Sequence, residues 1–239
     1  DSVYNVNLTE KLLATVLSKL SNFIPEAGIW MNTQRPEWND ANNALVGYGV
    51  SMVTLYYTRR YQQYLLHLFS EVEFDQVEIS TELVELLNSI NSTFVDNRHL
   101  LEGKISDTDR RLILDRLGRA ADSFRAGLYS HGFAGGRVAV ETSQLIAFCQ
   151  TSLEFIDHSI RANRRQDGLY HAYNLMTATE DGIEITYLYE MLEGQVAVLS
   201  SGYLSPEESL AVLEALRQSA LYTERQNSYL LYPDRELRR

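Results

Sequence analysis

The sequence predicts an all-α fold built from helical hairpins. Apolar residues recur every three or four positions in at least five segments, and residues that cap helices precede several of them. No convincing stretch of alternating apolar and polar residues predicts a strand. Helices that alternate with loops are typical of hairpins stacked into a solenoid or a toroid. We therefore expect residues 1–239 to form a single α-helical domain.

The first two helices are predicted for residues 8–23 and 41–69. In the first, apolar residues share one face, and Asn7 stands at the N-cap position with Glu10 three residues later. The second contains no proline and is apolar or aromatic nearly all round. A helix of that kind is surrounded by other helices, so it should lie at the centre of the fold.

Five further helices are predicted downstream. Ser106, followed by Asp109, introduces one of them, and Ser205-Pro206-Glu207-Glu208 introduces the last with an N-cap, a proline at N1 and a glutamate at N3. These helices are centred on residues 83–90, 113–128, 145–160 and 185–198 and on the residues after Ser205. Two segments interrupt this pattern, at residues 129–138 and 166–182. The second is too long for a simple turn, which makes it a secondary candidate for a site.

Composition excludes some classes of function. A net charge of −11 and a pI near 4.9 do not suit a nucleic-acid partner, and no stretch of about 20 apolar residues predicts a membrane span. We interpret three arginine pairs, at 59–60, 110–111 and 164–165, as solvated helix faces. Cys149 is the only cysteine and lies on an apolar stretch, so we expect a buried thiol and no disulfide.

The first residue is Asp1 and no signal sequence precedes the first helix, so we expect a piece of a longer polypeptide. The compartment is left open, with the cytoplasm favoured. We expect no metal and no organic cofactor.

The segment Arg35-Pro36-Glu37-Trp38-Asn39-Asp40 is the main candidate site. Two carboxylates, an indole and several amides gather there, and Asn42 and Asn43 follow at once. A sugar offers hydroxyls to amides and carboxylates while its C–H face lies on an indole, and a carboxyl of raised pKa can protonate a glycosidic oxygen. We expect Glu37, Trp38 and Asp40 to line the principal pocket.

The sequence Glu37-Trp38-Asn39-Asp40, followed by Gly49-Val50-Ser51-Met52 and a long aromatic segment, resembles the catalytic segment of the cellobiose phosphorylase family. The resemblance covers about residues 24–69 and implies an (α/α)6 toroid of six hairpins, of which this chain would be a portion. It also implies that Asp40 is the general acid of an inverting cleavage of glycosidic bonds. Glu37 stands where the family more often has aspartate, and no phosphate site is recognisable downstream.

The predicted function is therefore that of a carbohydrate-active enzyme, or part of one, acting as a hydrolase or a phosphorylase on an oligosaccharide or glycoside. Inorganic phosphate is a candidate co-substrate. Asp40 and Glu37 are the predicted catalytic residues. The predicted substrate-binding residues are Trp38, Asn39, Arg35, Asn43, Tyr170 and His171.

Several alternatives stay open. Asn39 or Asp40 could simply cap the helix predicted at 41–69. Glu190 and Glu193 could supply a catalytic base or be exposed or salt-bridged glutamates three residues apart on a helix. At the level of the whole chain, the rival is a non-catalytic helical-hairpin protein that binds a glycan or a protein partner.

Overall fold

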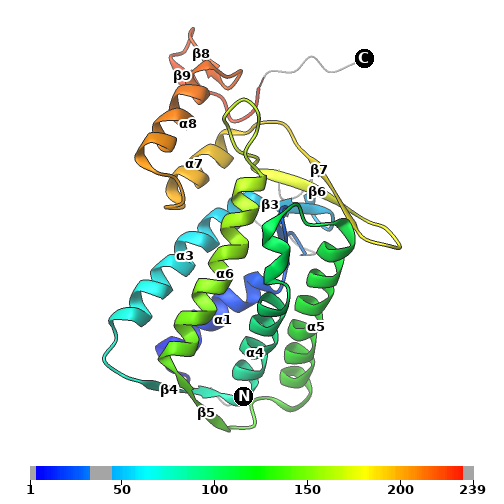
Figure 1. The fold of residues 1–239 in the computed structure, drawn as a ribbon, viewed down its shortest axis with the longest axis vertical. Coiled ribbons are helices and arrows are strands. Elements are labelled where there is room, and N and C mark those ends of the chain that lie inside the picture. The colour runs from blue at the N-terminus through cyan, green and yellow to red at the C-terminus, as the bar shows by residue number, and fades with distance from the viewer. Residues whose placement is uncertain (1–3, 33–44, 234–239) are drawn as a thin grey trace. The chain divides into compact units, whose positions relative to one another are not determined.

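The computed structural model describes residues 4–32 and 45–233, and it shows a mixed α/β fold (Figure 1). The structure is 56% helical and 16% strand and contains a five-stranded curled antiparallel sheet. The prediction of an all-α fold, and with it the toroid of helical hairpins, is therefore wrong. The sequence did not predict the strands because most of them are only two to five residues long, which is too short for a recognisable alternation of apolar and polar residues.

The chain divides into two compact units. Unit 1 takes its described residues from Asp1–Pro25, Tyr61–Ile156 and Glu180–Ile183, and unit 2 from Glu26–Arg60, Asp157–Thr179 and Glu184–Arg239. No comparison tests the expectation of a single domain within a larger one, so that expectation stays a prediction.

Unit 1 is mainly helical. Its elements are α1 (Leu8–Leu20), most of α3 (Met52–Glu71), α4 (Thr81–Asp96), the 3-10 helix η1 (Arg98–Glu102), α5 (Asp107–His131) and most of α6 (Thr142–Ala162). Asn7 caps α1 by accepting a hydrogen bond from the Glu10 N–H at 2.9 Å, and Ser106 caps α5 in the same way. Both predicted caps are confirmed. The core between these helices is closely packed, and the Phe94 ring contacts the rings of Phe23 and Phe155.

A two-stranded antiparallel ladder joins distant parts of unit 1. Strand β4 (Gln76–Ser80) pairs with β5 (Arg137–Glu141) in the register Gln76↔Glu141 to Ser80↔Arg137. At its end, Glu10 is 2% exposed and accepts hydrogen bonds from Ser80 and Arg137, both at 2.7 Å. Arg137, which follows two glycines, is thereby committed to a buried carboxylate within the fold.

Unit 2 is built around an antiparallel sheet. Its strands are β2 (Gly28–Trp30), β3 (Gly49–Ser51), β6 (Tyr173–Ala178) and β7 (Ile183–Tyr187), and the full sheet has the order β1-β2-β3-β6-β7 with β1 at Phe23–Ile24. Gly28 has φ +122°, and a Cβ there would lie 2.7 Å from the Ser51 carbonyl oxygen. Only glycine therefore allows β2 and β3 to approach this closely.

Unit 2 also contains the first part of α3, the end of α6, α7 (Leu192–Ser200), α8 (Pro206–Gln218) and a small hairpin of β8 (Tyr222–Thr223) with β9 (Ser228–Tyr229). The Ser205 hydroxyl accepts from the Glu208 N–H at 3.1 Å, and the Glu208 carboxylate accepts from the Ser205 N–H at 2.9 Å. This capping box confirms the start predicted for the last helix.

Two predicted helices begin in the wrong place. The long apolar helix starts at Met52 and not at 41, because Gly49–Ser51 pairs with two neighbouring strands and the Ser51 hydroxyl accepts from the Thr54 N–H at 3.0 Å. Likewise, the helix predicted at 185–198 begins at Leu192, since Ile183–Tyr187 is a strand. In both cases sheet pairing overrides local preference.

The arginine pairs are not simply solvated. Arg59 is 8% exposed and forms an ion pair with Asp157 at 2.7 Å, and Arg110 is 3% exposed and contacts Asp107. The third pair includes Arg165, which lies at the candidate site below. The interpretation as helix faces in solvent fails because one member of each pair is turned inward onto a carboxylate.

Candidate functional site

Most of the predicted site lies outside the described residues. This holds for Arg35, Glu37, Trp38, Asn39, Asp40 and Asn43, and so for the prediction that Glu37, Trp38 and Asp40 line the principal pocket. The two ends of their segment are described. The Met31 N–H donates to the Gly49 carbonyl at 2.9 Å, the Gly47 N–H donates to Met31 at 3.1 Å, and the Trp30 indole N–H donates to Gly47 at 2.9 Å. The motif therefore belongs to the connection of a β-hairpin.

The two other predicted residues, Tyr170 and His171, lie beyond the opposite end of the sheet. Strand β6 runs antiparallel to β3, so that Tyr173 pairs with Ser51 and Leu175 pairs with Gly49. His171 precedes β6 and therefore lies beyond Ser51, whereas the described ends of the motif's segment lie beyond Gly49.

His171 stands at the end of a tightly constructed loop that follows α6. Within it, the Arg165 N–H donates to the Leu169 carbonyl at 2.8 Å, and Gly168 turns the chain with φ +83°. The Asp167 carboxylate accepts from the Leu169 N–H at 3.1 Å. Short polar side chains that bond to the backbone two residues on are typical of such turns. The loop is therefore fixed by its own hydrogen bonds.

An amide side chain holds the loop from the other side. Gln195, on α7, is fully buried; its Oε1 accepts from the Tyr170 N–H at 2.9 Å and its Nε2 donates to the Tyr170 carbonyl at 2.8 Å. The Tyr170 ring is 3% exposed and meets the Tyr56 ring edge to face. Tyr170 thus belongs to the core of unit 2, and its predicted contact with a substrate stays a prediction.

The His171 ring is held in one orientation. Its Nδ1 lies 3.0 Å from the Leu188 carbonyl oxygen, which can only accept, so Nδ1 carries the proton and Nε2 presents a lone pair. The ring stacks on Tyr187 at 4.6 Å between centroids. Burial, and then the nearby Arg165 guanidinium, lower the pKa of His171 below its ordinary value. The imidazole is therefore neutral at neutral pH.

Arg165 joins two carboxylates beside this histidine. Its guanidinium donates to Asp167 at 2.8 Å and to Glu190 at 3.1 Å, and Arg165 and Glu190 are each about one-fifth exposed. Burial alone would raise the pKa of Asp167, but hydrogen bonds from Arg165 and Leu169 hold that pKa below its usual value. Asp167 is therefore an anion and a hydrogen-bond acceptor across the neutral range.

These residues border a cleft of about 490 Å³, which Arg164 and Gln166 also line. The cleft joins a half-exposed tyrosine ring, a neutral imidazole, a guanidinium and the Asp167 carboxylate. Of these, the sequence indicated His171; it also indicated, as an alternative, Glu190, which binds Arg165 but does not line the cleft. It did not indicate Arg165 or Tyr187. The available signal for Arg165 was its place in a loop of Gly and Asp, where a solvated helix face is not expected.

The second catalytic alternative, Glu193, has a structural partner. Its carboxylate accepts a hydrogen bond from the Tyr173 hydroxyl at 2.9 Å. Glu190 forms an ion pair with Arg165 at 3.1 Å, which agrees with the alternative of a salt-bridged glutamate. Both glutamates are therefore engaged with neighbouring side chains.

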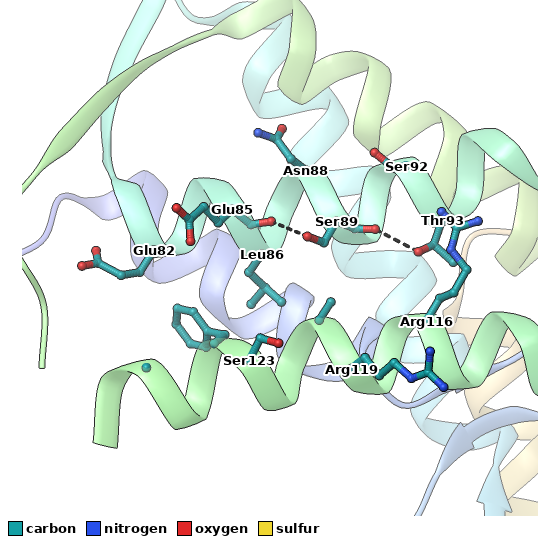
Figure 2. A pocket seen from close by; sticks show the side chains of 13 residues that line it. Glu82, Glu85, Leu86, Asn88, Ser89, Ser92, Thr93, Arg116, Arg119 and Ser123 are labelled. Carbon is teal, nitrogen blue, oxygen red and sulfur yellow. Dashed lines mark hydrogen bonds between the residues drawn. The ribbon is translucent and has the colours of Figure 1, made fainter. Parts of the chain in front are cut away.

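Unit 1 contains a larger depression of about 640 Å³ between two helices, the α4–α5 groove (Figure 2). Its floor is apolar, with Leu86, Ala120 and Phe124. Its ends carry opposite charges, Glu82 and Glu85 at one end and Arg116 and Arg119 at the other, as Figure 2 shows. No residue of this groove was indicated by the sequence.

Two classes of site find no support in the described part of the chain. Among residues 4–32 and 45–233, no three side chains of His, Cys, Asp or Glu gather in a way that could hold a metal ion. None of the helices described there has both the length and the apolar character needed to cross a membrane.

Comparison with known proteins adds no relative. No known protein family matches this chain, and no curated protein is similar enough to be counted as a relative.

Proposed function

We propose that this chain is a carbohydrate-active enzyme, or part of one, in which the cleft beside His171 binds a sugar. The observation that carries the proposal is the His171–Tyr187 stack beside Arg165 and its two carboxylates. A neutral imidazole and a carboxylate next to a partly exposed aromatic ring suit a pyranose, because its hydroxyls both donate and accept while its C–H face is apolar.

Each group in the cleft has a definite part in this proposal. The free Nε2 of His171 accepts a hydrogen bond from a sugar hydroxyl, and the Asp167 carboxylate accepts another. Tyr187, 46% exposed, offers the exposed part of its ring to the C–H surface of the sugar. Arg165 holds both carboxylates in place and helps to keep Asp167 ionised, and it does not need to contact the sugar.

The chemical step rests on the motif and not on the cleft. Because His171 lies beyond Ser51 whereas the described ends of the motif's segment lie beyond Gly49, the cleft would hold a sugar unit away from the bond that is cleaved. Asp40 remains the proposed general acid of an inverting cleavage with Glu37 beside it in the sequence, by resemblance to the cellobiose phosphorylase family. Water or inorganic phosphate would be the second reactant. The toroid that usually accompanies this chemistry is not part of the proposal.

The experiment measures turnover and binding separately. Aryl glycosides and disaccharides are incubated with the chain, with and without inorganic phosphate, and released sugar or sugar phosphate is quantified. Asp40→Asn should lower turnover by about 10²–10⁴-fold and leave binding intact. His171→Ala and Tyr187→Ala should weaken binding by about 3- to 20-fold, as expected for one lost hydrogen bond or one lost ring contact.

Matched controls separate the cleft from general surface effects. Tyr64 is 54% exposed on α3 and provides a control for Tyr187, and the exposed His67 provides one for His171. Equal effects of Tyr64→Ala and Tyr187→Ala would contradict the sugar cleft. Binding without turnover on any glycoside would support the rival class, a non-catalytic glycan-binding protein.

A further inference from the structure

The α4–α5 groove has the chemistry of a surface that receives a helix. Small side chains, including Ser89, Ala120 and Ser123, leave room between the two helices, and the floor beneath them is apolar. Amphipathic helices bind in grooves of this kind through apolar residues on one face, and flanking charges determine their direction.

The charges at the two ends of the groove are partly uncommitted. Glu82 receives a hydrogen bond from the Ala134 N–H, and Arg116 pairs with Asp96 at 2.6 Å. Glu85 and Arg119, in contrast, have no side-chain partner among the residues that the structure describes. One unpaired charge of each sign is therefore available at opposite ends of the groove.

Helix α8 of unit 2 has a complementary exposed face. Its buried side is formed by Val212 and Leu216, both below 5% exposed, whereas Leu210 is 56% and Leu213 47% exposed. Leucines on the solvent side of a helix have no role in the unit's own core. They form an apolar stripe of the kind that partner helices present.

The charges of α8 run in the required order. Its first turn carries Glu207 and Glu208, and its last turn carries Arg217. The backbone and the Ser205 hydroxyl hold the pKa of Glu207 below its usual value. Arg217 lies over the Tyr222 ring at 3.7 Å, which fixes it at the end of the helix.

We propose that the α4–α5 groove binds helix α8 of a second copy of this chain, with Glu207 beside Arg119 and Arg217 beside Glu85. The helix fits the length of the groove, because Glu207 to Arg217 spans about 15 Å and the α4 side of the groove, from Glu82 to Thr93, spans about 17 Å at 1.5 Å per residue. In this direction Leu210 and Leu213 lie over the apolar floor.

The remaining charge of the α8 face is accommodated. Glu214 lies on the same flank of the helix as Glu207, on the side of α5. It falls between Ser123 and Gly127, where the hydroxyl of Ser123 has no partner among the described residues. The alignment therefore sets Glu214 beside a hydrogen-bond donor rather than beside Glu82 or Glu85.

The contact joins two different surfaces, so each copy can use both at once. Such head-to-tail contacts produce a series of growing oligomers or a closed ring, not only a symmetric dimer. Three helical turns also form a small interface compared with the ~800 Å² per partner of stable complexes. Self-association should therefore be weak and visible only at tens to hundreds of micromolar protein.

Sedimentation velocity of the full chain between 5 and 300 µM tests the proposal. The wild-type chain should sediment faster as concentration rises, and added salt should reduce the effect, because exposed charges are screened. Arg119→Glu alone and Glu207→Lys alone should each weaken association about 3- to 30-fold, and the double variant should recover most of that loss. Arg125→Glu changes the same charge on α5 outside the groove and should have no effect.

A wild-type chain that stays monomeric at every concentration would overturn the proposal. The proposal would also be overturned if Arg119→Glu associated as strongly as the wild-type chain, or if the double variant associated no more strongly than either single variant, because either result would place the contact elsewhere. Circular dichroism of each variant confirms that the helices are retained. Leu210→Ser provides a second measurement on α8 that does not depend on charge, and it too should weaken association.

Discussion

The amide clamp around Tyr170 leads to the sharpest prediction for the candidate site. Gln195 is fully buried and bonds both the N–H and the carbonyl of Tyr170, the residue before His171. Gln195→Leu keeps the size of the side chain but leaves these two buried backbone groups without a partner. Each costs about 1–3 kcal/mol when unsatisfied, so unit 2 should lose about 2–5 kcal/mol of stability.

Hydrogen exchange measures this effect locally. The Tyr170 amide should exchange about 30- to 4,000-fold faster in Gln195→Leu, since each 1.4 kcal/mol of the lost stability corresponds to a factor of ten. The same variant should weaken any sugar binding that depends on His171, because the loop that orients the ring is loosened.

Gln62→Leu is the matched control. Gln62 is also fully buried, but its partners are the side chains of Ser152 and Cys149, and the Ser152 hydroxyl retains a hydrogen bond to the Phe148 carbonyl. This variant should leave Tyr170 exchange unchanged. If Gln195→Leu also left it unchanged, the clamp would not be what holds the loop, and the argument from buried backbone groups would be refuted.

Three further predictions concern separate parts of the chain. Because the pKa of His171 is lowered in the folded chain, the unfolded chain binds a proton at this histidine more readily, and stability should fall as the pH drops below about 6.5. Urea midpoints from pH 8 to 5 should show this fall in the wild-type chain but not in His171→Gln. Gly28→Ala should destabilise the chain by about 2–4 kcal/mol, because its Cβ would meet the Ser51 carbonyl. Gly47→Ala, at φ +87° in open space, should cost only about 1 kcal/mol of backbone strain. Denaturation midpoints compare the two variants, and equal losses of stability would contradict the steric reason. Burial raises the pKa of the Cys149 thiol to about 12, so it should resist iodoacetamide at pH 8 until the chain is unfolded, as mass spectrometry would detect.

Local chemistry in the sequence predicted the capped starts of α1, α5 and α8 correctly. Asn7, Ser106 and Ser205 all accept the N–H three residues later, because a cap is decided within one turn of chain. Strand pairing is decided elsewhere. Gly49 pairs with Leu175, and the sequence near either residue does not predict this pairing. An apolar run was therefore assigned wholly to a helix although its beginning belongs to a sheet.

The same difference in range explains what was found of the site. His171 was predicted because a histidine in a long loop can be recognised from the sequence alone. The contact between Arg165 and Glu190 joins residues 25 positions apart, and the stack of His171 on Tyr187 joins a loop to a strand that was predicted as helix. Clusters of this kind depend on the fold, so they could not be predicted from an incorrect fold class.

The corrected start of α3 also changes how the Trp38-Asn39-Asp40 motif is interpreted. Its simplest alternative role was to cap the helix predicted at 41–69. That helix begins at Met52, and Ser51 provides the side-chain cap. Capping α3 therefore cannot account for the carboxylates, amides and indole in this connection. Because strands β2 and β3 fix both ends of the connection, the proposal for Asp40 depends on a hairpin and not on a toroid.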